Sequence, residues 1–102
     1  MAAQSGIKLV TVWVLYDYDS AVSENVFENV KAEILDKCSN PEVVPGTLTV
    51  RAENTELPEG PEPFEVSVSY ELVWSKIRTG RYPTSASDMK VITDAVKAAY
   101  RR

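Results

Sequence analysis

Two groups of polar residues in this chain have the types and spacing that could support chemistry, and the first is an acidic pair. Asp17 and Asp19 close an apolar run, in VWVLYDYDSAV, and residues two apart in an extended chain point to the same side. Carboxylate oxygens are the hard ligands that Mg²⁺ prefers. The pair is therefore a candidate metal and catalytic site. The alternative, which we favour, is that Asp19 or Ser20 caps a following helix and Asp17 is a turn residue.

The second group is a basic turn in the segment KIRTGRYPTS. Lys76, Arg78 and Arg81 precede a predicted helix that Thr84 or Ser85 would cap. Helix N-termini attract anions, and a guanidinium can bind a phosphate or carboxylate through two parallel hydrogen bonds. These five residues form a candidate site for an anionic partner. The alternative is a solvated turn between a strand and a helix, whose arginines pair with the acidic first half of the same chain.

Composition excludes several classes of function. The chain has 102 residues, enough for a single α+β domain, and contains no histidine. The absence of histidine excludes His-based triads, Cys–His dyads and His-ligated metals. One cysteine, Cys38, cannot form an internal disulfide, which favours a reducing compartment, so we expect a cytoplasmic protein. No apolar run has the length of a membrane span. We expect no cofactor, unless the acidic pair takes up Mg²⁺.

The charge is unevenly distributed along the chain. The formal net charge is −4, yet residues 71–102 hold seven basic residues against three acidic ones. Residues 1–70 hold four basic residues against twelve acidic ones. An acidic chain of this kind is a poor general binder of nucleic acid. A nucleic-acid partner is thus possible through the basic third of the chain but is not favoured.

Hydrophobic patterns predict five elements. The clearest is a long strand over 64–74, FEVSVSYELVW, in which apolar and polar residues alternate. A first strand is expected over 7–18 and a second over 44–53, with one helix ending near Cys38 and another following Ser85. The first helix is expected to bury one apolar stripe, formed by Val26, Phe27, Val30, Ile34 and Cys38. Residues 1–6 are expected to be a flexible tail and residues 54–63 a mobile acidic loop.

The order β-α-β-β-α resembles a ferredoxin-like fold without its last strand, with both helices on one face of a three-stranded sheet. The element order predicts an antiparallel hairpin between the second and third strands, and a parallel neighbour for the first strand through the crossover that contains the first helix. In the ferredoxin-like arrangement without its last strand, the first strand is left at the edge of the sheet.

The first strand is apolar on both faces, and such a strand usually has both faces covered, so something must cover its second face. A long apolar edge also invites pairing with another chain. We therefore expect a homo-oligomer joined through the first strand, at Val10, Val12, Val14 and Tyr16. The alternative is a different topology that covers this strand within its own chain.

Three families share short patterns with the chain. The strand followed by D-x-D resembles the first motif of haloacid-dehalogenase-type phosphatases. It also resembles Cas2-like nucleases, small ferredoxin-like dimers with an aspartate at the end of the first strand. Both resemblances imply a metal-dependent phosphoesterase that uses Asp17 and Asp19. Residues 66–100, a strand, a basic Gly turn and a helix, are similar to phage tail-completion proteins, which implies a ring-forming structural subunit.

Taken together, the sequence favours a non-enzymatic, self-associating interaction module over an enzyme. Its partner would be a second copy or another protein, and the basic turn would hold an anionic group of that partner. The alternatives are the small metal-dependent phosphoesterase and the tail-completion-like subunit.

Overall fold

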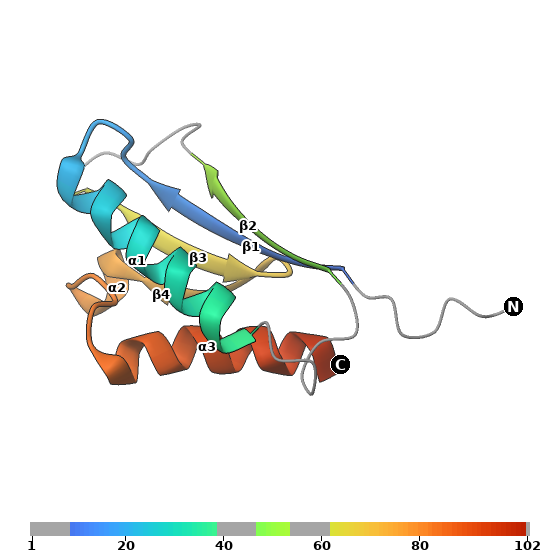
Figure 1. Cartoon of the computed structure of the whole chain (residues 1–102). Helices are drawn as coiled ribbons and strands as arrows, with labels where there is room; N and C mark the ends of the chain where they lie inside the picture. The colour runs from blue at the N-terminus through green and yellow to red at the C-terminus, as the bar shows by residue number, and fades with distance from the viewer. Residues whose placement is uncertain (1–8, 39–46, 54–61, 102) are drawn as a thin grey trace, which may run out of the picture.

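The computed structural model describes residues 9–38, 47–53 and 62–101 (Figure 1). The expected tail at 1–6, and residues 54–61 of the expected acidic loop, lie outside this part of the chain. The elements, in chain order, are β1 (Leu9–Tyr16), α1 (Ala21–Cys38), β2 (Thr47–Glu53), β3 (Phe64–Val68), β4 (Glu71–Ser75), α2 (Lys76–Thr79) and α3 (Ala86–Arg101).

The described strands form one mixed sheet in the order β2-β1-β3-β4. β1 runs parallel to β2 and antiparallel to β3, and β3 runs antiparallel to β4. The long connection through α1 allows the parallel pairing, as the sequence predicted. The predicted three-stranded sheet is wrong, because the sheet has a fourth strand. The predicted hairpin between the second and third strands is also wrong, because β3 pairs with β1 and not with β2.

The prediction that the first strand is an open edge is wrong. β1 lies inside the sheet, with β2 on one side and β3 on the other. The four residues expected to form an oligomer interface, Val10, Val12, Val14 and Tyr16, are buried in the core of their own chain. They point toward the helices and offer no surface to a second copy. These side chains are apolar because they form part of the hydrophobic core.

The predicted long strand over 64–74 is a hairpin of two shorter strands. It reverses at Ser69 and Tyr70, whose φ angles are 49° and 72°. Positive φ at both central residues is the signature of a type I′ turn, whose twist suits a two-residue hairpin. The alternation of apolar and polar residues continues through the turn, so the pattern gave no sign of the reversal. Tyr70, expected to face the core, is instead 89% exposed.

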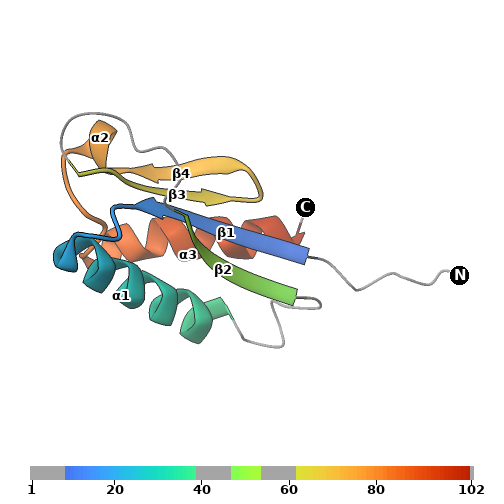
Figure 2. The same ribbon diagram turned by 90° about the horizontal axis from the view of Figure 1, so that it is seen from above.

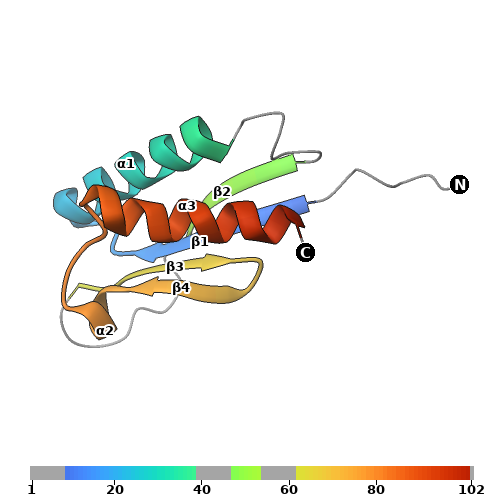
Figure 3. The ribbon, with the colours of Figure 1, turned by 90° about the horizontal axis from the view of Figure 1, so that it is seen from below.

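Both long helices cover the same face of the sheet, which makes a two-layer α+β structure (Figures 2 and 3). The apolar stripe predicted for α1 is buried, at Val26, Phe27, Val30, Ile34 and Cys38. From α3, Ile92, Val96 and Ala99 enter the same core. Burial raises the pKa of the Cys38 thiol, which points to the Thr93 carbonyl at 3.8 Å. None of the described helices is long and apolar enough to cross a membrane.

The opposite face of the sheet has no described helix over it (Figure 2). The side chains of β1 alternate, so Leu9, Trp13 and Leu15 point to this second face. Leu9 is 67% exposed, and Trp13 and Leu15 are partly exposed. The sequence predicted that a strand apolar on both faces would need a cover on each. Within the described residues, helices cover only one of the two faces.

Candidate functional site

The acidic pair organises the entry into α1. The backbone N–H of Asp19 donates to Oδ1 of Asp17 over 2.9 Å, a local turn of the kind that aspartate favours. The helix cap is Ser20, whose Oγ accepts from the N–H of Ser23 at 3.2 Å. Of the two residues expected to cap this helix, Ser20 does so. Among the described residues, no group of three or more His, Cys, Asp or Glu side chains is placed to hold a metal ion.

The basic turn contains a short helix that the sequence did not predict. α2 covers Lys76–Thr79, is capped by the Ser75 side chain and ends at Gly80 with φ 80°. Glycine adopts this left-handed conformation without steric cost, so the chain can turn sharply here. The hydroxyl of Thr79 lies 2.9 Å from the Ser75 carbonyl and 3.1 Å from the Arg81 carbonyl. The turn is thereby fixed by its own hydrogen bonds.

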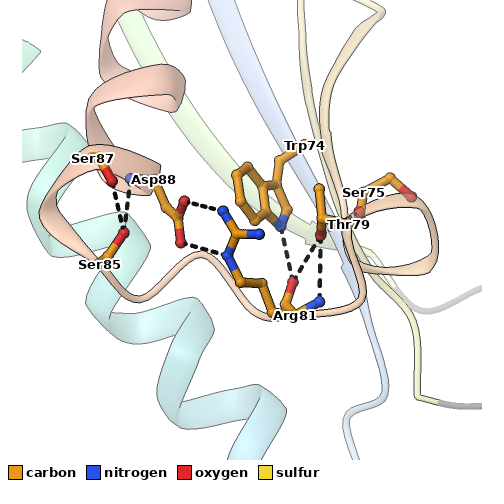
Figure 4. Close-up of polar contacts among 7 residues, drawn as sticks. All are labelled: Trp74, Ser75, Thr79, Arg81, Ser85, Ser87 and Asp88. Atoms are coloured by element: carbon orange, nitrogen blue, oxygen red, sulfur yellow. Dashed lines mark hydrogen bonds and ion pairs between the residues drawn. The ribbon is translucent and has the colours of Figure 1, made fainter.

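Arg81 is engaged within the chain (Figure 4). Its guanidinium donates to both carboxylate oxygens of Asp88, over 2.8 and 3.3 Å, and lies 5.2 Å from the centre of the Trp74 ring. The indole N–H of Trp74 donates to the Arg81 carbonyl at 3.3 Å. The Arg81 hydrogen bonds, together with those from Ser85, hold the pKa of Asp88 below its ordinary value. Arg81 is thus paired within its own chain, as the alternative expected, but its partner Asp88 lies in the basic C-terminal third and not in the acidic first half.

The two predicted cap residues of the last helix have different positions. Ser85 is the cap, because its Oγ accepts from the Asp88 N–H at 3.1 Å, as the predicted capping box requires (Figure 4). Thr84 is exposed, and its backbone N–H donates to the Tyr82 carbonyl at 3.0 Å. Both residues therefore shape the approach to α3.

Lys76 belongs to a polar network that the sequence did not reveal. Its ammonium donates to the Glu62 carbonyl at 2.9 Å and lies 4.8 Å from the centre of the Tyr82 ring. The Tyr82 and Ser20 hydroxyls both donate to Oε2 of Glu62, which lowers the pKa of Glu62. The Tyr82 proton is used there, so the buried Ser23 hydroxyl must donate to the Tyr82 oxygen, 2.7 Å away. The members of this network are far apart in the sequence and come together only in the folded chain. No local sequence pattern therefore predicts the network.

Arg78 differs from its two basic neighbours. Its side chain is exposed and makes no hydrogen bond or ion pair with any residue of the described ranges. It borders a cavity of about 250 Å³ between β4, α2 and α3. The five residues predicted as one anion site are therefore divided. Arg78 faces this cavity, and the other four stabilise the connection between the sheet and α3.

The uncovered sheet face has its own hollow, of about 320 Å³, lined by Trp13, Glu53, Ser67 and Tyr70. Arg51, Trp13 and Ser67 lie in register across β2, β1 and β3, and Glu53, Leu15 and Glu65 form the adjacent row. The Arg51 guanidinium lies 5.5 Å from the centre of the Trp13 ring. The face thus combines apolar side chains at its centre with charges of both signs.

No known protein family and no curated protein matches the sequence.

Proposed function

We propose that this protein is a non-enzymatic assembly module that associates with a second copy of itself through the uncovered face of its sheet. One observation carries the proposal. Leu9, Trp13 and Leu15 line a sheet face that no described helix covers, although the opposite face is packed under two helices. Contiguous exposed apolar side chains with a polar surround are typical of protein–protein contact sites. Sheets that pack face to face approach to about 10 Å and bury such side chains.

The charges on this face favour a second copy as the partner. Arg51 and Glu53 are two residues apart on β2, beside Trp13 and Leu15 respectively. A two-fold axis that crosses the strands between these two rows brings Arg51 opposite Glu53 of the partner subunit. The same axis brings Trp13 opposite Leu15 of the partner subunit. A two-fold interface must be self-complementary, and this face satisfies the requirement in both charge and apolar character.

The charged pairs and the apolar side chains are expected to contribute differently to the free energy of association. Exposed ion pairs contribute about 0.2–1 kcal/mol each, so the two symmetry-related pairs would set the orientation of the subunits and add modestly to affinity. Complete burial of a large apolar side chain contributes about 1.5–3 kcal/mol, and Trp13, which is already partly buried, would contribute the share that belongs to its exposed area. Trp13 is therefore the residue on which the association should depend most.

The test is the molar mass in solution over a range of concentrations, by size exclusion with light scattering. We expect a dimer for the wild type and a monomer for Trp13→Lys. Ile77→Lys is the matched control, because Ile77 is an exposed apolar residue on α2, away from the sheet face. Circular dichroism must show that both variants remain folded. A wild type that stays monomeric at the highest concentration, or a dimer that Trp13→Lys leaves intact, would refute the proposal.

A further inference from the structure

A groove is lined by residues of β4 and by Arg78 of the short helix that follows it. It is the cavity of about 250 Å³ lined by Leu72, Val73, Trp74, Ser75, Arg78, Thr79 and Val91. The lining residues come from β4, from α2 and, through Val91, from α3. Figure 3 shows α2 directly after the end of β4. Leu72 and Val91 are exposed apolar residues at this groove. The groove thus offers apolar contact along a strand and a positive charge.

The strand that borders the groove is an edge strand. β4 pairs with β3 on one side, and no described strand lies on its other side. Alternate backbone N–H and C=O groups of an edge strand point outward and can pair with an added chain. Proteins commonly block such edges with lysine or proline, and β4, with the sequence ELVWS, contains neither. The register of β4 with β3 shifts between Leu72 and Trp74, so an added strand would pair with the stretches on either side of this irregularity.

The positive charge of Arg78 at the groove favours an added strand that carries a negative side chain. Lys76 bonds to the Glu62 carbonyl and Arg81 to the Asp88 carboxylate, which leaves Arg78 as the cation of this turn without a side-chain partner in the described residues. A guanidinium is best satisfied by a carboxylate, which it can bind through two hydrogen bonds. A negative side chain on the added strand would complement Arg78.

We propose that the outer edge of β4 binds an extended segment of a partner protein, as an added strand whose carboxylate side chain pairs with Arg78. An apolar residue of the segment would lie in the groove beside Leu72 and Val91. Backbone pairing supplies affinity in this mode of recognition, and the side-chain contacts supply specificity. This surface differs from the Trp13–Arg51 face, so the inference does not depend on self-association.

The test uses fluorescein-labelled peptides of eight residues that alternate valine and threonine, with one glutamate placed at each position in turn. A second set carries lysine at the same positions. Binding is followed by fluorescence anisotropy, with a single-stranded oligonucleotide of similar length as a competing polyanion. We expect some glutamate peptides to bind with Kd below about 1 mM, and their lysine counterparts not to bind. Arg78→Ala should weaken binding about tenfold or more. Lys90→Ala, on the exposed side of α3, should leave it unchanged.

Methylation of the peptide backbone tests strand addition without altering the protein. Only alternate amides of an added strand face β4, so N-methylation of one alternate set should abolish binding and methylation of the other set should not. Equal effects of the two sets would overturn the proposal. So would the absence of binding across the glutamate peptides, an unchanged affinity in Arg78→Ala, or tighter Arg78-dependent binding of the oligonucleotide.

Discussion

The guanidinium of Arg51 lies 5.5 Å from the centre of the Trp13 ring, on neighbouring parallel strands where the two residues are in register. A cation over an indole face is attracted by about 0.5–1 kcal/mol at an exposed site. The contact places a positive charge directly beside the largest aromatic side chain of the uncovered sheet face. Glu53 follows two residues later on the same side of β2. These neighbours make the face both apolar and electrically self-complementary.

Asp88 should make the stability of the fold depend on pH. Its pKa is lowered in the folded protein, chiefly by the Arg81 hydrogen bonds, so the stabilisation is present above the ordinary aspartate pKa of about 4. It is lost as pH falls through the lower folded value. Asp88→Asn should therefore reduce the melting temperature at pH 7, and its difference from the wild type should shrink below about pH 4. Thermal melts from pH 7 to pH 2.5 measure this difference.

Asp94→Asn is the matched control for that experiment. Asp94 pairs with Lys90 at 2.6 Å, but its side chain is 52% exposed, against 6% for Asp88. Exposed pairs are weakened by solvent screening, so Asp94→Asn should cost less than Asp88→Asn at pH 7. Equal losses in the two variants, or a loss in Asp88→Asn that does not change with pH, would contradict the role given to the Arg81–Asp88 pair.

Tyr82→Phe should destabilise the fold through Ser23. The buried Ser23 hydroxyl lies 2.7 Å from the Tyr82 oxygen and would lose that partner. A buried hydroxyl left without a partner costs about 1–3 kcal/mol, which urea denaturation would measure. Adding Ser23→Ala to Tyr82→Phe should recover part of the loss, because both polar groups are then gone. Tyr70→Phe, at an exposed turn residue, is the control that should change little. A double variant less stable than Tyr82→Phe would argue against the network.

Tyr70→Gly should stabilise the hairpin between β3 and β4. The left-handed conformation costs a non-glycine residue about 1–2 kcal/mol, and Tyr70 has little packing to lose. Part of the gain is offset by the greater freedom of glycine in the unfolded chain, so we expect about 0.5–1 kcal/mol. Tyr70→Ala removes the same ring without relieving the backbone. Unfolding free energies that place the glycine variant no higher than the alanine variant would show that the turn is not strained.

The sequence predicted the elements whose signals are local. The helix stripe from Val26 to Cys38 is confirmed, as are the Ser85 cap and the parallel pairing of the first two strands. The stripe and the cap depend on periodicity and capping chemistry within a few residues, and the parallel pairing depends on the length of the connection through α1. The hairpin at Ser69 and Tyr70 could not be predicted in this way. Neither residue is a usual choice for a type I′ turn, and the alternation runs through both.

The candidate sites show the same distinction. The types of Lys76, Arg78 and Arg81 pointed correctly to a basic turn, but only tertiary contacts decide which of them is already paired. Asp88, the partner of Arg81, lies on α3, and Glu62, the partner of Lys76, lies in the segment before β3. Neither hydrogen bond can be predicted from the spacing of these residues in the sequence. The exposure of Trp13 likewise depends on which face the helices cover. Which face the helices cover is determined by the packing of the whole domain.

The most direct test of self-association through the sheet face is a charge exchange between Arg51 and Glu53, followed by sedimentation equilibrium. Arg51→Glu and Glu53→Arg should each be monomeric alone, because each would place like charges opposite one another across the two-fold axis. An equimolar mixture of the two variants should form a heterodimer, and the double variant Arg51→Glu/Glu53→Arg should dimerise like the wild type. Monomers in both the mixture and the double variant, beside a dimeric wild type, would contradict the proposed interface.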